Sequence, residues 1–314
     1  MRALLSPASL KGVLSARAAA AALARGLTEA GGVGIELPVA DGGEGTCDVL
    51  EAALAGEWRE AIVSDPLGRP VLARWLLLEC GRAVVEAASA IGLPLLDVAE
   101  RDPLRASSRG LGELLVEALS AEPVSALYVG LGGTATVDGG AGLREVVDGL
   151  PVPTSALCDV RTRLADAATV FGPQKGASRE DVVILERRLA GMAELAPFAD
   201  VPGSGAAGGL GAALAALGAE LVPGAEAILD LAGFDERLAG CDLVVTGEGE
   251  VDTTTTAGKA PGEVARRARA AGVRCVVFGG RVRAEVPGAH TVSLSGDPER
   301  SELDLVELGR SLAA

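Results

Sequence analysis

The stretch GLGGTATVDGGAG, residues 130–142, follows the apolar run SALYV and best indicates the fold. An apolar strand that enters a glycine-rich loop recurs at GIELPVADGGEG and at DLVVTGEGEVD. Runs rich in Ala, Leu, Glu and Arg, which favour helix, alternate with these strands. The pattern predicts an α/β protein with parallel strands, in which ligands bind at the carboxyl ends of the strands.

Two local signals add detail to this plan. Ser15 is placed to cap a helix that Gly26 would end. Residues 58–78 alternate polar and apolar side chains around the turn signal DPLGRP, which predicts a β-hairpin.

The composition limits the classes of partner. The chain has 314 residues, of which 49% are hydrophobic, so it can bury a core. Its formal net charge of −15 opposes binding to nucleic acid. The five cysteines are scattered without a C-x-x-C pair, which fits a reducing cytoplasm better than a disulfide or zinc scaffold. The longer uncharged stretches are broken by Pro and Gly, so we expect no membrane span.

Lysine is rare in this chain. The three lysines among 28 basic residues are Lys11, Lys175 and Lys259, and each one is next to a glycine. A lysine beside a glycine-lined loop suits a phosphate approached from one side, although three ordinary surface lysines are the alternative. The single histidine, His290, is expected to be an ordinary loop or strand-end residue, so histidine-based catalysis is not expected.

Carboxylates recur in the same glycine-rich loops. An acid beside glycines can bind Mg²⁺ or act as a general base, although Asp-Gly is also a frequent turn pair. Together with the lysines and the glycine loops at 130–142 and 205–211, the acids favour a phosphoryl-transfer site, which needs positioning, cations and a base. There is no Walker A motif, because Ala260 follows Lys259. The acids are Asp41, Glu44, Asp138, Asp159, Glu248 and Asp252.

Ten motifs follow one another in an order that resembles the bacterial glycerate kinase family, in its type-1, glycerate 2-kinase group. The resemblance extends over nearly the whole chain. The motifs are SLKGVLSA, PVADGGEGT, DPLGRPV, RDPLRASSRGLGELL, GLGGTATVDGGAG, CDV, VFGPQKGA, DVPGSGAAGGLGAAL, TGEGEVD and GKAP.

The resemblance implies a Rossmann-like domain with a parallel sheet, made of residues 1–55 and 233–314. A second, mixed α/β domain, residues 56–232, is inserted in the chain. The implied reaction is the ATP- and Mg²⁺-dependent phosphorylation of D-glycerate to 2-phosphoglycerate or 3-phosphoglycerate, in a cleft between the domains. A cytoplasmic location is expected from the scattered cysteines, and assembly into a homodimer is left open.

The family motifs also imply roles for individual residues. Asp159 is expected to take the hydroxyl proton, and Lys11 to contact phosphate or the glycerate carboxylate. Asp41 and Asp252 are candidate magnesium ligands. The residues expected to bind substrate or phosphate are Asp41, Glu44, Gly132, Gly133, Thr134, Asp138, Lys175, Gly208, Gly209, Glu248, Asp252 and Lys259.

Several positions depart from the family pattern, and the segment between Leu143 and Cys158 is shorter than usual. These departures leave two alternatives open: a kinase for another small hydroxy acid, or a catalytically weak nucleotide-binding homologue with a regulatory role. The departing residues are Ala8, Val137, Arg161–Arg163, Glu250 and Ala257.

Overall fold

The computed structural model describes residues 1–79, 81–120 and 124–313, with Ala257 described by its backbone only. These residues form two compact units. The domain boundaries at 55/56 and 232/233 stay predictions from the sequence. The first unit is Met1–Asp41, Asp48–Leu54 and Ala225–Ala314, and the second is Gly42–Cys47 and Ala55–Gly224.

The first unit is built on a five-stranded sheet with the order β11-β10-β9-β1-β2. Every pairing in it is parallel, which confirms the predicted Rossmann-like sheet. The strands are β1 (Arg2–Leu5), β2 (Val33–Glu36), β9 (Leu243–Val251), β10 (Arg274–Val282) and β11 (His290–Ser293). The helices are α1 (Ala16–Glu29), α9 (Gly224–Leu231), α10 (Phe234–Leu238), α11 (Ala260–Ala270) and α12 (Ser301–Leu312), and α2 (Thr46–Ala53) begins at the unit boundary.

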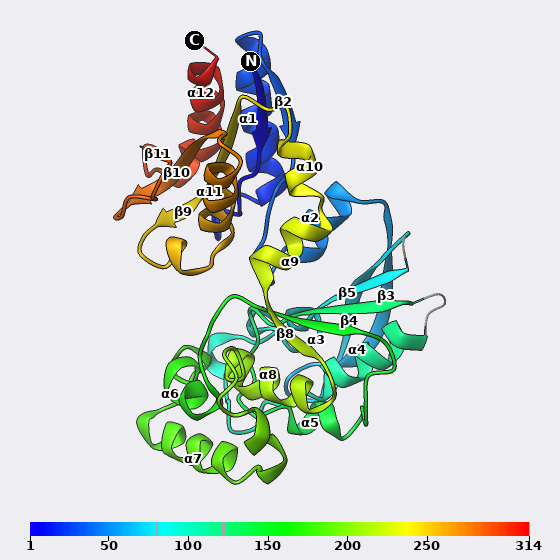
Figure 1. Cartoon of the computed structure of the whole chain (residues 1–314). Coiled ribbons are helices and arrows are strands. Elements are labelled where there is room, and N and C mark those ends of the chain that lie inside the picture. Colours follow the sequence, from blue (N-terminus) through cyan, green and yellow to red (C-terminus); the bar gives the residue numbers. More distant parts are fainter. Residues whose placement is uncertain (80, 121–123, 314) are drawn as a thin grey trace. The chain divides into compact units, whose positions relative to one another are not determined.

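Helix α1 shows where the local signals hold and where they fail. The Ser15 hydroxyl caps it as expected, accepting a hydrogen bond from the Ala18 amide at 3.1 Å. Gly26 does not end the helix, which runs on to Glu29. A Cβ on Gly26 would lie 1.9 Å from the Val306 carbonyl oxygen, so this glycine lets α1 and α12 pack closely, as Figure 1 shows.

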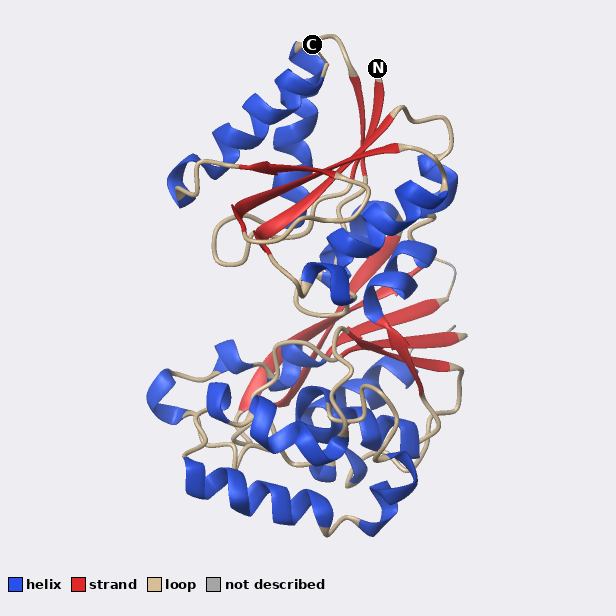
Figure 2. Cartoon of the chain, turned by 60° about the vertical axis from the view of Figure 1, so that its left-hand side comes forward, coloured by secondary structure: helices blue, strands red, loops and turns tan. Residues whose placement is uncertain are grey.

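The second unit contains a six-stranded mixed sheet with the order β3-β4-β5-β6-β7-β8. The predicted hairpin is confirmed as the antiparallel pair β3 and β4, and β5 to β8 run parallel. Figure 2 shows the helices of this unit gathered on one side of its sheet. The strands are β3 (Gly56–Ser64), β4 (Pro70–Leu78), β5 (Arg82–Glu86), β6 (Ala126–Gly130), β7 (Thr154–Cys158) and β8 (Glu220–Pro223). The helices are α3 (Ala87–Ile91), α4 (Arg109–Ser120), α5 (Ala141–Arg144), α6 (Ala167–Phe171), α7 (Arg179–Ala190) and α8 (Ala206–Ala216).

Leucine, valine and alanine fill the core of each unit, as the scarcity of aromatic residues requires. Val137, where the chain departs from its family, is 1% exposed within the core of the second unit. Its side chain therefore contributes packing. Among the described residues, no helix is long and apolar enough to cross a membrane.

The start of α8 is a left-handed turn. Ala207 has φ 54° and ψ 31°, and Gly208 and Gly209 continue the left-handed conformation with φ 75° and 96°. Glycine adopts this conformation at little cost, whereas an L-residue such as alanine is strained there by roughly 1–2 kcal/mol. A Cβ on Gly208 would lie 2.3 Å from the Thr136 carbonyl oxygen, so the turn also needs glycine to approach the loop after β6.

The strained turn predicts opposite outcomes for two alanine-to-glycine substitutions in α8. Ala207→Gly relieves the strain and should leave the free energy of unfolding unchanged or raise it by up to about 1 kcal/mol. Ala212→Gly, in the regular part of the same helix, should lower it by at least about 1 kcal/mol. Chemical denaturation of both variants measures the difference, and equal losses would contradict a strained Ala207.

Candidate functional site

In the first unit, predicted site residues meet at the carboxyl end of β9. Glu248 accepts a hydrogen bond from the Thr255 hydroxyl at 2.7 Å and pairs with the Lys259 ammonium at 3.3 Å. The same Thr255 hydroxyl accepts the Asp252 amide at 3.1 Å, so it closes the loop that separates the two acids. We call Glu248, Thr255 and Lys259 the β9 cluster.

Burial is the main influence on the pKa of Glu248. Removal from water raises the pKa of this carboxyl, and the negative charge of Asp41 acts in the same direction. The hydrogen bond from Thr255 and the ammonium of Lys259 lower the pKa and oppose this effect in part. Asp41, which follows β2, thus lies close enough to Glu248 for their charges to interact. The structure therefore brings Asp41, Glu248 and Lys259 together at one edge of the parallel sheet.

The other predicted residues of this unit border the β9 cluster. Asp252 accepts hydrogen bonds from the Thr254 amide and hydroxyl at 2.7 and 2.5 Å, which hold the pKa of its carboxyl below the ordinary value. The Lys11 side chain is exposed in the loop after β1. Its backbone amide lies 3.8 Å from where a Cβ on Gly249 would be. His290 begins β11 with an exposed side chain, which confirms it as a strand-end residue.

In the second unit, the loop after β6 packs against a second glycine segment. A Cβ on Gly132 would lie 2.4 Å from the Cα of Gly43, and one on Gly130 would lie 2.6 Å from the Gly42 carbonyl oxygen. The Gly132 amide donates to that carbonyl at 3.4 Å. Several glycines of the two motifs are therefore required for close contact between two backbones. Gly133 is exposed and Gly132 half-buried, so these two residues form the open tip of the loop.

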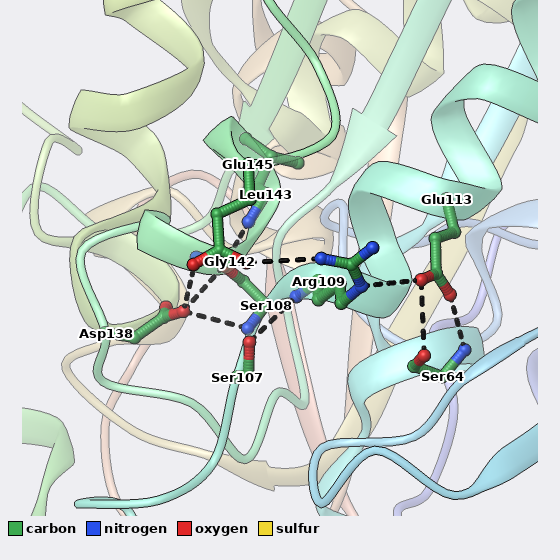
Figure 3. A network of polar contacts seen from close by, with 9 residues as sticks. All are labelled: Ser64, Ser107, Ser108, Arg109, Glu113, Asp138, Gly142, Leu143 and Glu145. Atoms are coloured by element: carbon green, nitrogen blue, oxygen red, sulfur yellow. Dashed lines mark hydrogen bonds and ion pairs between the residues drawn. The ribbon is translucent and has the colours of Figure 1, made fainter.

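Asp138 anchors the far end of this loop, as Figure 3 shows. One carboxylate oxygen accepts the Ser108 amide at 2.8 Å, the Ser108 hydroxyl at 2.7 Å and the Gly142 amide at 3.1 Å. The other oxygen accepts the Gly140 amide at 3.1 Å. The Ser108 hydroxyl in turn accepts the Leu143 amide at 2.9 Å. Both carboxylate oxygens of Asp138 thus hold the loop to the start of α4 and α5.

Lys175 lies inside the second unit, 3% exposed, in the turn that follows α6. Its ammonium donates to the Thr134 hydroxyl at 3.0 Å and to the Thr136 carbonyl at 2.8 Å. Burial lowers the pKa of this amine from the ordinary 10.5 to about 7, and the charge of Asp138 opposes the shift. The amine is therefore directed into the loop after β6 and away from solvent.

The remaining predicted residues of the second unit lie on separate loops. Asp159 follows β7 with an exposed side chain, and Glu44 is exposed in the segment before α2. Gly208 and Gly209 are buried in the left-handed turn, where the Gly139 amide donates to the Gly208 carbonyl at 3.1 Å. Their roles as ligands for substrate or phosphate stay predictions.

Two functional candidates were not found by the sequence reasoning. Thr255 lies in a run of four threonines between TGEGEVD and GKAP, and Ser108 lies in RDPLRASSRG. Both motifs were recognised, but hydroxyl groups in loops carry no local signal that distinguishes a structural partner from a solvent-exposed side chain. Thr255 lies between Glu248 and Asp252, and Ser108 lies directly before α4 and contacts Asp138. These positions become visible only in the fold.

The buried amine of Lys175 predicts a pH dependence of stability. Above about pH 7 the folded chain has lost this proton, whereas the unfolded chain keeps it up to about pH 10.5, so the unfolding free energy rises with pH between these values. The full slope is about 1.4 kcal/mol per pH unit. Lys175→Met should remove this contribution.

The measurement is urea denaturation of the parent and of Lys175→Met between about pH 7.5 and 8.5. Thiols of the unfolded chain begin to ionise at the upper end of this window, but they do so equally in both proteins, so the difference between the two slopes reports Lys175. Burial raises the pKa of Cys158 and Cys275 to about 12 from an ordinary 9.0, which would lower stability at higher pH. Equal slopes for the two proteins would show that Lys175 keeps its proton in the folded state.

Two α/β units, each with acidic and basic side chains around the carboxyl ends of parallel strands, place the chain in the class of α/β phosphotransferases. Comparison with known proteins gives the particular family. A model of the glycerate kinase family matches residues 3–150 and 149–296. The chain belongs to the glycerate kinase family.

Relatives of known name cover most of the chain. Glycerate 2-kinase of Escherichia coli (strain K12) is 38% identical over 86% of this chain and 82% of its own length. Glycerate kinase of Bacillus subtilis (strain 168) is 36% identical over 90% of this chain and 85% of its own. The crystal structure of a protein from Salmonella typhimurium LT2, provisionally named glycerate kinase 2, matches with a TM-score of 0.87 and 33% identity over 100% of this chain and 97% of that one.

Proposed function

We propose that this chain transfers the γ-phosphoryl group of ATP to the 2-hydroxyl of D-glycerate and forms 2-phosphoglycerate. The observation that carries the proposal is the β9 cluster, a half-buried acid with a lysine and a hydroxyl at a strand end. Phosphoryl transfer depends on positioned cations and carboxylates, which this cluster provides. The family supports glycerate as the acceptor, and the name of the Escherichia coli relative supports the 2-hydroxyl.

The start of α11 supports phosphate binding beside this cluster. The helix begins at Ala260, directly after its N-cap residue Lys259, and in the described part of the chain no side chain caps its first turn. Unpaired amides and the helix dipole at an N-terminus attract anions, and here a lysine adds its charge. In the resting protein the ammonium of Lys259 is paired with Glu248. We infer that a bound phosphate competes with Glu248 for this ammonium.

Magnesium fits the same edge of the sheet. Asp41, Glu248 and Asp252 supply hard oxygen donors of the kind that Mg²⁺ prefers, and the burial of Glu248 leaves it in need of positive charge. Among the described residues, no three acidic, histidine or cysteine side chains converge as a complete metal site. Mg²⁺ bound with ATP needs only one or two carboxylates. Asp41 and Asp252 would hold it, and it would neutralise charge on the phosphates during transfer.

Proton transfer and binding of the anionic substrate groups are assigned to two exposed side chains. Asp159 at the end of β7 would accept the proton of the attacking hydroxyl, and Lys11 would bind the phosphate or the glycerate carboxylate. Both side chains are exposed and therefore accessible to a ligand. Assembly into two copies and a cytoplasmic location stay predictions from the sequence.

The proposed activity predicts that release of ADP from Mg²⁺-ATP depends on D-glycerate. A coupled assay with D-glycerate and a panel of small hydroxy acids measures it, and ³¹P NMR of the product distinguishes 2-phosphoglycerate from 3-phosphoglycerate. Faster turnover of another hydroxy acid would show a kinase of different specificity. No turnover with any acid, together with nucleotide binding by calorimetry, would show a regulatory homologue.

The role of Asp159 predicts a large loss of turnover in Asp159→Asn, by about 10²-fold or more, since an amide cannot accept the proton. The control is Asp200→Asn in the same unit, where a 93% exposed carboxylate pairs with Arg163 at the surface. The control should keep full activity and both variants should keep the parent melting temperature. Normal turnover of Asp159→Asn would exclude Asp159 as the base.

A further inference from the structure

The buried amine of Lys175 has no direct part in the proposed reaction. A lysine that is 3% exposed is costly to bury, and its two hydrogen bonds both go to the loop after β6. The ring of Phe171 lies 5.8 Å from the ammonium and closes another side. Among the described residues, both hydrogen bonds of this ammonium therefore go to the scaffold of the loop.

Thr134 and Thr136, which accept hydrogen bonds from Lys175, follow directly after the open tip of the loop. On the other side of the tip, the Leu93 amide donates to the Gly133 carbonyl at 2.8 Å and the Ala135 amide to the Ile91 carbonyl at 2.9 Å. Lys175 holds Thr134 and Thr136 from within, while Gly132 and Gly133 stay accessible. Because glycines have little conformational preference of their own, the tip depends on these neighbours for its shape.

Few charges act on Lys175 from the surrounding elements. Asp138, at the end of the same loop, is the charged group that stabilises its protonated form. On the side of the turn, the Arg101 backbone packs against Gly176, whose Cβ would lie 2.8 Å from the Arg101 carbonyl oxygen. Phe171 on α6 adds no formal charge. A new negative charge at the loop tip would therefore act on a cation with a single acidic neighbour among the described residues.

We propose that Lys175 is a positioning residue for phosphoryl transfer, which fixes the loop so that the Gly133 amide at its tip can hold an anionic group of a substrate. Lys175 does not touch that substrate. This inference rests on the proposed function, because the anionic group held at the loop tip would belong to a substrate of that reaction. Backbone amides of a glycine loop are suitable donors for phosphate or carboxylate oxygens.

A proton should be linked to ligand binding. Burial holds the pKa of Lys175 at about 7, so a large fraction of the free protein carries a neutral amine at that pH. An anion at the tip stabilises the ammonium electrostatically and raises this pKa. Binding then takes up a proton near neutral pH, and a lysine with a purely structural role would show no such change.

The chain allows this to be measured directly, because it has only three lysines. Lysine labelled with ¹³C at Cε gives three signals, and Lys175→Met identifies the signal of Lys175. We expect this signal to titrate near pH 7 and its midpoint to rise by at least about half a pH unit with saturating D-glycerate or a non-hydrolysable ATP analogue. The ligand that moves the midpoint more is the one that the loop tip holds.

A matched pair of variants tests the positioning role by kinetics. Thr134→Val removes the hydroxyl that accepts from Lys175. Thr136→Val removes a buried hydroxyl that has no hydrogen-bond partner among the described residues, and it leaves the Thr136 carbonyl in place. We expect Thr134→Val and Lys175→Met to lower kcat/KM about tenfold or more, with Thr134→Ser restoring activity. Thr136→Val should match the parent.

The outcomes separate this inference from the proposed function. A parent protein that turns over no glycerate refutes the proposed function, whatever the lysine signal does. An active parent with an unmoved Lys175 midpoint for both ligands refutes the positioning role. So do Lys175→Met and Thr134→Val proteins that are less stable but retain parent kcat and KM, because Lys175 is then only structural.

Discussion

The close approach of two glycine segments determines the shape of the second unit's strand ends. Gly42–Gly43 and Gly130–Gly132 lie so near each other that a single added Cβ at Gly132 would be 2.4 Å from a backbone atom. Side chains therefore cannot occupy this contact, and backbone amides and carbonyls form the local surface. The tip that emerges from it, Gly132–Gly133, presents main-chain groups and not side chains to a ligand. The neighbouring anchors at Asp138 and Lys175 act on a loop that is already held by this contact.

The two units use charge in different ways. In the first, the acid Glu248 is half-buried, and its pKa is raised by burial and by Asp41 while Lys259 partly compensates. In the second, the buried group is the base Lys175, whose pKa is lowered by burial while Asp138 partly compensates. Burial thus favours the uncharged form of both groups, because it raises the pKa of the acid and lowers the pKa of the base. Ionisable groups with perturbed pKa values of this kind cluster at functional sites.

The sequence was sufficient to predict the helices and strands, but it did not predict several contacts between them. The parallel strands, the hairpin of β3 and β4 and the Ser15 cap follow from periodicity and from turn or capping residues, which are local signals. Gly26 was misread as a helix end because its reason is a contact with Val306, far away in the chain. The burial of Lys175 and the hydrogen bond of Thr255 to Glu248 were equally invisible. Each depends on segments that come together only when the sheets have formed.

The glycines beside the three lysines all have a backbone conformation that favours glycine, while the lysines themselves differ in environment. Each lysine is next to a glycine with positive φ: Gly12 at 73°, Gly176 at 100° and Gly258 at 125°. These glycines make the turns that direct the chain at strand and helix ends. The lysines themselves are in three environments: exposed in the loop after β1, buried under the loop after β6, and paired with Glu248 before α11.

Arginine could not replace lysine equally at these places. Its guanidinium stays charged at all relevant pH values and is planar and wide, whereas a lysine amine can be buried and give up its proton. The site of Lys175 demands this, because it offers one hydroxyl, one carbonyl and an aromatic face in place of a carboxylate fork. At Lys259 a flexible ammonium pairs with a single carboxylate oxygen of Glu248. The environments of Lys175 and Lys259 therefore suit a compact cation on a flexible side chain better than a planar guanidinium.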